Sequence, residues 1–216
     1  MMNFSREFVF QRLFTLLTAP LIVTGNTHSS NVVDGLSSTI GLCFGEPVDG
    51  PGFQANTKIT AVDEAAKSIT LSLPTTTTVT KAALTVTPYK FTSRKLYDIP
   101  DLGEDKRPSL IQCEPEENFN PEFTGQPTMQ ILNVFILIVV WTKSYNGPGI
   151  SLVNPRLDAL DQVLAPPPLL QAQTLGFIDG VPVVNHCWIE GKITKVGGDL
   201  DGNGVAIVPL KLLVPA

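Results

Sequence analysis

Few side chains in this chain could take part in catalysis or bind a metal, and they are widely separated. There are two histidines, His28 and His186, and the second is followed directly by Cys187. A histidine beside a cysteine can supply a base and a thiol nucleophile. The surrounding pattern predicts a strand, however, and neighbouring side chains of a strand point to opposite faces. These two residues therefore cannot act on one another, and a structural histidine is the favoured interpretation.

A second candidate is the aspartate-rich segment DLDGNG. Asp199, Asp201 and Asn203 occupy the first, third and fifth positions of a calcium-binding loop, and Gly204 the sixth. The twelfth position holds Leu210, where such a loop requires a bidentate glutamate. The residues that follow predict a strand and not a helix. A hairpin turn is therefore favoured over a calcium site, and we expect no bound metal.

Carboxylates gather between residues 114 and 122, where four glutamates surround two prolines. Paired carboxylates can serve as general acid and base, but a proline-rich acidic loop is usually just solvated. The GxSxG, HExxH, GxxxxGK and GxGxxG motifs are missing from the sequence. We therefore expect neither an enzyme nor a cofactor.

Composition and charge narrow the class of protein further. The chain has 216 residues and is 43% hydrophobic, which allows a sizeable core. Its net charge is −5 and no basic stripe alternates with aromatics, which argues against a nucleic-acid surface. Cys43, Cys113 and Cys187 are far apart, as expected for a reducing cytoplasm. The most apolar run, 131–141, is too short for a membrane helix.

The region from Leu21 to Lys90 differs in composition from the rest of the chain. It holds 13 of the 21 threonines and no arginine. Threonine suits exposed β surface because its branched Cβ packs on the pleat while its hydroxyl stays in water. Alternating runs at 57–62 and 68–73 predict a hairpin. We therefore predict a host domain formed by 1–20 and 91–216, interrupted by a small all-β inserted module at 21–90.

The host residues predict an α+β fold, with two helices packed on one mixed or antiparallel sheet. A helix capped by Asn3 or Ser5 is expected to run to about Thr18. Asn154-Pro155 predicts the start of a second helix. The other expected elements are a strand or exposed arm at 93–98, a polar loop at 99–108, a strand at 109–114, a connection at 118–127, a central strand at 128–141 buried on both faces, and strands at 174–177, 182–189, 193–197 and 205–214.

The order of the host segments resembles a protein family. It runs REFVFQRLFTLLTA, SRKLYDIPDLGEDKRPSLIQCE, MQILNVFILIVVW, NPRLDALDQVL, QTLGFIDGVPVVNHCWIEGKI and VAIVPLKLLVP. In this order the segments resemble the tail-terminator proteins of tailed bacteriophages, also called neck or tail-completion proteins. Members of that family usually pass from the first helix almost directly to the arginine-led strand, so the insert is a departure. VDGLSSTIGLCFGEPVDGPGFQANTKITAVDEAAKSITLS is itself similar to a β module of various phage structural proteins.

The resemblance implies a virion structural protein that forms a ring, typically a homohexamer, and caps the finished tail tube at the neck. The implied partners are further copies, the tail tube protein and head–tail connector or neck proteins, with no membrane or sequence-specific nucleic acid. The resemblance also implies that the protein is assembled in the host cytoplasm and is located in the virion, at the tail or neck. The candidate contacts between subunits or with the tube are charged residues in the loops of the host domain: Arg94, Lys95, Asp98, Asp101, Lys106 and Arg107.

Three alternatives stay open. The charged loop residues named above are equally expected in a solvated loop that makes no contact with another subunit. The chain could be another head–tail connector, or a virion-surface binding or decoration protein whose β insert contacts the host surface or neighbouring virion proteins. It could also be a monomeric α+β domain.

Overall fold

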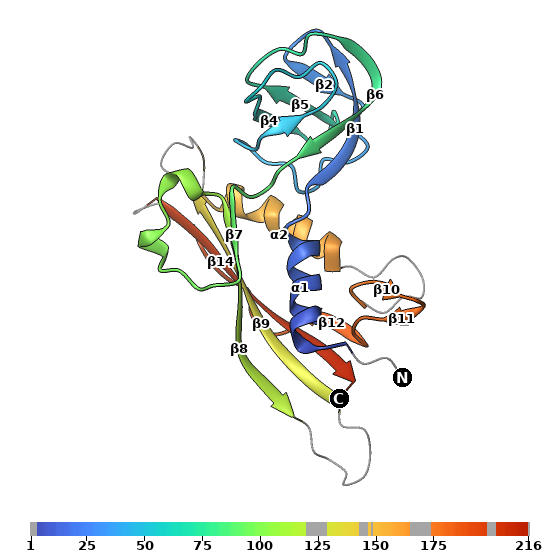
Figure 1. Ribbon diagram of the computed structural model, residues 1–216. Helices are drawn as coiled ribbons and strands as arrows, with labels where there is room; N and C mark the ends of the chain where they lie inside the picture. The colour runs from blue at the N-terminus through green and yellow to red at the C-terminus, as the bar shows by residue number, and fades with distance from the viewer. Residues whose placement is uncertain are drawn as a thin grey trace.

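The computed structural model describes residues 4–119, 129–142, 147, 149–164, 174–197 and 202–215. Within these ranges the chain combines two α-helices with strands in mostly antiparallel sheets, which is consistent with the expected α+β class. Two six-stranded sheets dominate (Figure 1). The small sheet contains β1–β6, from residues 21–86, and the large sheet contains β7–β9 and β12–β14. Each sheet has its own cluster of buried apolar residues.

Helix α1 (Arg6–Leu17) forms where the sequence predicts a capped amphipathic helix. Ser5 is the N-cap, and its hydroxyl accepts a hydrogen bond from the amide of Phe8 at 3.2 Å. This bond satisfies one of the amides that a helix N-terminus leaves without a partner. The buried face of the helix consists of Val9, Phe10, Leu13 and Leu17.

The small sheet closes on itself. Its strands are β1 (Leu21–His28), β2 (Val32–Asp34), β3 (Val48–Asp49), β4 (Ile59–Asp63), β5 (Ser68–Leu71) and β6 (Thr78–Val86), in the order β3-β6-β1-β2-β5-β4. The two ends of this order meet, because the Val48 amide donates to Thr57 O at 3.1 Å and the Ile59 amide to Glu46 O at 2.9 Å. Strands β4 and β5 confirm the predicted hairpin.

The first and last strands of the small sheet start and finish side by side. Leu21 at the beginning of β1 pairs with Val86 at the end of β6. The chain therefore leaves α1, builds the small sheet and returns to almost the same place before β7 begins (Figure 1). An excursion with adjacent ends disturbs the rest of a fold little.

The large sheet is built around two 13-residue strands. Its strands are β7 (Phe91–Ser93), β8 (Ser109–Phe119), β9 (Met129–Trp141), β12 (His186–Ile189), β13 (Thr194–Val196) and β14 (Asn203–Pro215). They follow the order β12-β14-β9-β8-β7, with β13 also on β14. Only the β7–β8 pairing is parallel among the described strand pairs. A separate hairpin joins β10 (Phe177–Ile178) to β11 (Val181–Pro182).

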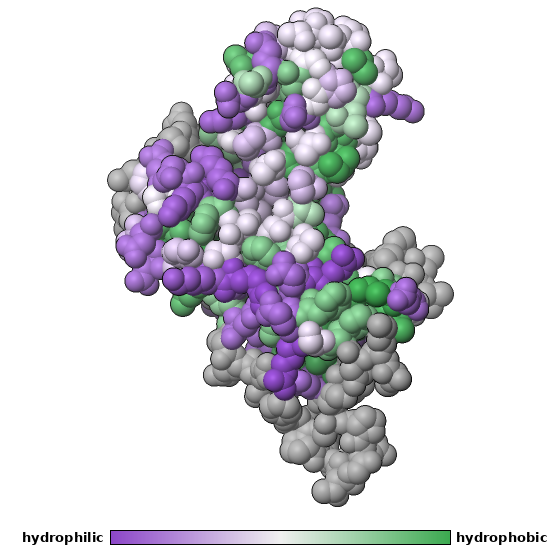
Figure 2. Space-filling model, viewed as in Figure 1, coloured by the Kyte–Doolittle hydropathy of each residue, from purple (hydrophilic) through white to green (hydrophobic). Residues whose placement is uncertain are grey.

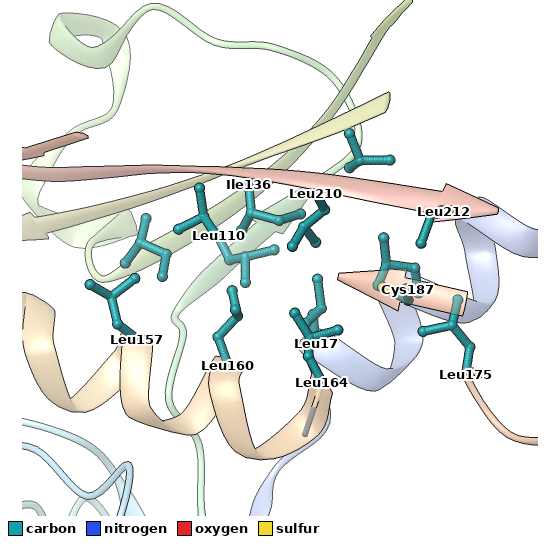
Figure 3. Packing of buried hydrophobic residues seen from close by; sticks show 14 of the residues in the cluster. Leu17, Leu110, Ile136, Leu157, Leu160, Leu164, Leu175, Cys187, Leu210 and Leu212 are labelled. Atoms are coloured by element: carbon teal, nitrogen blue, oxygen red, sulfur yellow. The ribbon is translucent and has the colours of Figure 1, made fainter. Parts of the chain in front are cut away.

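Both helices cover one face of the large sheet. Leu157, Leu160 and Leu164 of α2 (Ile150–Leu164) point at the sheet, where Leu110, Ile136, Leu210 and Leu212 meet them (Figure 3). Even-numbered residues of β9 and β14 supply this face because strand side chains alternate. Each fully buried aliphatic side chain contributes roughly 1.5–3 kcal/mol of hydrophobic free energy.

Several predicted boundaries are wrong. The strand predicted at 93–98 is β7, which ends at Ser93, and the strands predicted at 174–177 and 182–189 are the β10–β11 hairpin at 177–182 and β12 at 186–189. Helix α2 begins at Ile150 instead of after Asn154, so Pro155 lies inside it. The hydrogen bond that proline removes is offset by the burial of Leu152 and Val153 in the extra turn. Strand β8 continues to Phe119, beyond the predicted start of a connection at 118. The register shifts between Cys113 and Glu116, a bulge where Pro115 is tolerated.

The prediction that the central strand is buried on both faces is also wrong for part of its length. Val139 of β9 is fully buried on the side away from the helices, but Phe135 on the same side is 38% exposed. A continuous apolar run cannot distinguish a strand buried twice from one whose second face is open. The open part of this face is the first feature of functional interest.

Candidate interaction surfaces

The outer face of the large sheet is the side turned away from α1 and α2. The register of the sheet pairs Ile131 with Leu213, Asn133 with Lys211, Phe135 with Pro209 and Leu137 with Ile207 across β9 and β14. In β12, His186 pairs with Leu213 and Trp188 with Lys211, so both side chains belong to the same face. Two long strands thus present apolar and aromatic residues along one side.

Part of the outer face is covered and part is open. Near Val139 and Val205 it is covered by Leu102 of the arm, which we define as residues 91–108. Farther along the strands, Phe135 remains 38% exposed and Ile207 36% exposed. Contiguous apolar surface of this kind on a folded protein marks an interaction site more often than chance exposure does.

Polar groups border the open part of the outer face. The His186 ring stacks on the Trp188 ring with 5.1 Å between centroids. The Trp188 indole N–H donates to Glu190 at 2.9 Å, and Lys211 Nζ donates to the same carboxylate at 2.7 Å. The hydrogen bond from Lys211 holds the pKa of Glu190 below its ordinary value. An apolar centre with a paired polar rim is the anatomy of a protein interface.

The arm is more ordered than the predicted polar loop. It begins with β7 and continues through two 3₁₀ turns, Ile99–Asp101 and Glu104–Lys106. Leu102, between the turns, is fully buried against Ile111, Val139 and Val205. Leu102, with Phe91, Tyr97 and Ile99 packed around the same cluster, therefore holds the arm on the outer face.

Arg94, a predicted contact residue, is engaged within the chain. Its guanidinium donates to both oxygens of Glu114, at 2.8 and 2.9 Å, and also to Glu7 and Gln11 of α1. The hydrogen bond that Arg94 donates to Glu7, followed by that to Glu114, raises the pKa of Arg94 above its ordinary value. Through Arg94, near the start of the arm, these paired charges connect α1 with β8.

Arg107, a second predicted contact, is almost completely buried. Its Nη2 donates to the carbonyl of Ile99 at 2.9 Å, and its Nη1 donates to Asn203 Oδ1. The guanidinium lies over the Trp141 ring, 5.0 Å from the centroid. This arginine therefore connects the end of the arm with the first residue of β14.

The other four predicted contact residues are more accessible. Lys106 and Lys95 both lie near the ring of Tyr97, at 6.0 and 5.8 Å from its centroid, and Lys106 also lies over Phe91. Asp98 and Asp101 are exposed at the first 3₁₀ turn. The structure thus gathers the two lysines around one aromatic pair and leaves the two aspartates at the surface.

Replacing Arg94 by methionine tests whether this residue is a contact or an internal tie. We expect the free energy of unfolding to fall by on the order of 1 kcal/mol, because a partly exposed bidentate ion pair is lost. Urea denaturation measures the change, with Lys95→Met as the matched control at an exposed position. Self-association should be unchanged in the Arg94→Met variant. Loss of association at unchanged stability would place Arg94 in a contact instead.

A buried ion pair at the junction of the small sheet and α2 was missed by sequence reasoning. Arg156 Nη2 lies 3.0 Å from Glu46 Oε1, and both side chains are almost fully buried. Arg156 also donates to Cys43 Sγ at 3.2 Å, and the Cys43 amide donates to Glu46 Oε2 at 2.9 Å. The sequence contains one indication of this pair. Arg156 interrupts the buried helical stripe of Leu152, Leu160 and Leu164, and a charged residue at such a position needs a partner.

Burial dominates the electrostatics of this pair. It raises the pKa of Glu46 to about 7, against the opposing attraction of Arg156 and the hydrogen bond from Cys43. The pKa of Tyr89 beside the pair is also raised, chiefly by burial. The carboxylate is therefore held in its charged form only weakly near neutral pH.

The remaining candidates from the sequence give no catalytic arrangement in the described part of the chain. Nε2 of His28 lies 3.1 Å from a carboxylate oxygen of Asp34, and both side chains are about half exposed. His186 is exposed whereas Cys187 is buried on the helix side, as the strand geometry predicts. No group of three or more His, Cys, Asp or Glu residues is placed to hold a metal among the residues described. Asp199 and Asp201 lie outside that part.

No family model matches the chain, and no curated protein matches it significantly. Neither helix, within the ranges given above, is long and apolar enough to cross a membrane.

Proposed function

We propose that this chain is a structural protein of a tailed-bacteriophage virion, a ring-forming subunit that closes the tail tube and joins it to the neck. The order of the host segments motivates the class. The observation that carries the proposal is the open outer face, with Phe135 and Ile207 exposed beside a stacked His186–Trp188 pair. In this proposal the surface serves assembly and the protein is not an enzyme.

A closed ring of identical copies requires two different surfaces that fit each other. The outer face supplies an apolar surface. The arm supplies a projecting one, because Leu96 is 63% exposed and is flanked by Lys95. Hydrophilic residues gather over the arm and in a band across the middle of the view in Figure 2. We pair the arm of one copy with the outer face of the next, so that Leu96 meets Phe135 and the charges form the rim.

The test is whether the protein assembles on tail tubes. Native mass spectrometry and negative-stain imaging, with and without the tail tube protein, should show rings and caps at tube ends. A protein that stays monomeric at high concentration and never associates with tail tube protein contradicts the proposal.

The small sheet favours a second candidate, a surface-binding role. Ile22 is 66% exposed and Val32 43% exposed on its outside, so it offers apolar contact points of its own. In that case the ring role would belong to a different protein, and this chain would decorate the virion or bind a neighbour through β1–β6.

Removal of the small sheet distinguishes the two roles. Residues 22–86 can be replaced by a short glycine–serine linker, because Leu21 and Val86 are paired neighbours. Arg156 is left unchanged, because the deletion removes Cys43 and Glu46 together, so that the guanidinium loses its cover along with its partner and can be solvated. We expect the shortened protein to fold and still to form rings. Retained rings with reduced adsorption of the particle would assign binding to the small sheet, whereas a folded shortened protein without rings would make that sheet part of the assembly.

A further inference from the structure

A pocket of about 110 Å³ lies where the small sheet, the arm and α2 meet. Gly45 lines it from the loop before β3, Lys90 from the connection that enters the arm, and Arg156 from α2. The end of the arm contributes Arg107, and the end of β9 contributes Trp141. Five separate parts of the chain therefore line one pocket.

The lining is rich in positive charge. Lys90, Arg107 and Arg156 line the pocket, against a single carboxylate in the lining, that of Glu104. Arg156 is only 2% exposed, and its Nε has no hydrogen-bond acceptor within the described residues. A buried N–H without an acceptor destabilises the folded state, because it has lost its hydrogen bond to water and gained none in return. A donor of this kind at the wall of a pocket indicates that an acceptor from outside the chain belongs there.

The cationic groups are already held in position. The Lys90 amide donates to Pro108 O at 2.8 Å, which fixes the residue at the rim while its side chain stays exposed. The Arg107 guanidinium is fixed between the Ile99 carbonyl and the Trp141 ring. Groups positioned before a ligand arrives lose little entropy on binding it.

We propose that this pocket binds a small oxyanion, a phosphate or carboxylate group, through Lys90, Arg107 and Arg156. Guanidinium and ammonium groups donate to such oxygens in short, charge-assisted hydrogen bonds. The volume admits one such group. Free phosphate and the acidic side chain of a partner protein carry the same chemistry. The inference does not depend on ring formation.

Two substitutions of exposed residues should change the affinity in opposite directions. Inorganic phosphate is titrated into the full chain at constant ionic strength, and calorimetry measures the affinity. Lys90→Gln removes a positive charge and with it the charge-assisted hydrogen bond, and should weaken binding about five-fold or more. Glu104→Gln removes the opposing charge and should tighten binding about two-fold to five-fold. Lys192→Gln, at an exposed lysine on another loop, should leave the affinity unchanged.

A second titration distinguishes the sources of the oxyanion. Acetate and a short glutamate-rich peptide replace phosphate in the same experiment. Binding of phosphate alone assigns a phosphate group, and binding of the carboxylates at comparable affinity assigns an acidic side chain. The proposal is overturned if neither anion binds, or if Lys90→Gln and Lys192→Gln weaken binding to the same extent. A purely structural role for Lys90 does not produce the opposite effects of the Lys90 and Glu104 substitutions.

Discussion

Phe135→Glu is expected to convert assembled rings into monomers. In the proposed assembly the Phe135 ring is covered by the arm of the next copy, and the substitution places a carboxylate in that apolar contact. Burying an unpaired charge costs several kcal/mol per interface. Because the copies are identical, every interface of a closed ring contains the same substitution. The assembled fraction at micromolar concentration should fall at least ten-fold. Native mass spectrometry and sedimentation velocity measure this fraction.

The monomer itself should tolerate the same substitution. Phe135 is already 38% exposed, so the melting temperature of the isolated chain should change by no more than a few degrees. Val163→Glu is the matched control, since Val163 on α2 is 39% exposed and lies on the opposite side of the large sheet. We expect that variant to assemble normally. Equal assembly of both variants would show that the outer face is not part of the interface.

Local signals in the sequence were sufficient where a residue's own neighbours determine its structure. Ser5, one of the two predicted caps, is the N-cap of α1, because capping needs only a hydroxyl three residues before an amide. The hairpin of β4 and β5 follows from alternation and a turn. The helix face of the large sheet is likewise predictable from the stripe of leucines in α2.

The features that the sequence did not predict depend on contacts between distant parts of the chain. The open face of β9 could not be predicted, because Phe135 and Val139 are equally apolar and only the position of the arm covers one of them. Arg94 and Arg107 look like loop charges in the sequence, yet Glu114 and Asn203 engage them from other strands. Glu46 and Arg156 are 110 residues apart, and their pairing requires the closed small sheet to rest on α2. Such pairings are set by tertiary packing and leave no local pattern.

Ionisation of Glu46 is expected to make the protein less stable as the pH rises. The folded state raises the pKa of this carboxyl from 4.5 to about 7, chiefly through burial. Between these two values the folded chain binds a proton that the unfolded chain has lost. The free energy of unfolding therefore falls as the pH rises through this range, and the contribution is fully present only below pH 4.5. One pKa unit corresponds to about 1.4 kcal/mol, so the loss is on the order of 3 kcal/mol.

Glu46→Gln removes this contribution because its side chain stays neutral at every pH. We expect the variant to match the parent protein near pH 5 and to exceed its stability near pH 8 by on the order of 2–3 kcal/mol. Urea denaturation at the two pH values measures both differences. Comparing the two proteins at each pH cancels the other titrating groups. A variant that is destabilised more at pH 8 than at pH 5 would mean that attraction to Arg156 outweighs the burial of the carboxylate.

The complementary substitution, Arg156→Met, should steepen the same pH dependence. Without the guanidinium, the charged Glu46 loses the attraction that opposes its burial, so its pKa rises further. The destabilisation relative to the parent protein should be larger at pH 8 than at pH 5. The double variant, Glu46→Gln with Arg156→Met, should recover most of the stability at pH 8, since neither buried charge remains. A double variant no more stable than Arg156→Met alone would show that the arginine acts through packing against Leu152 and Cys43 and not through its charge.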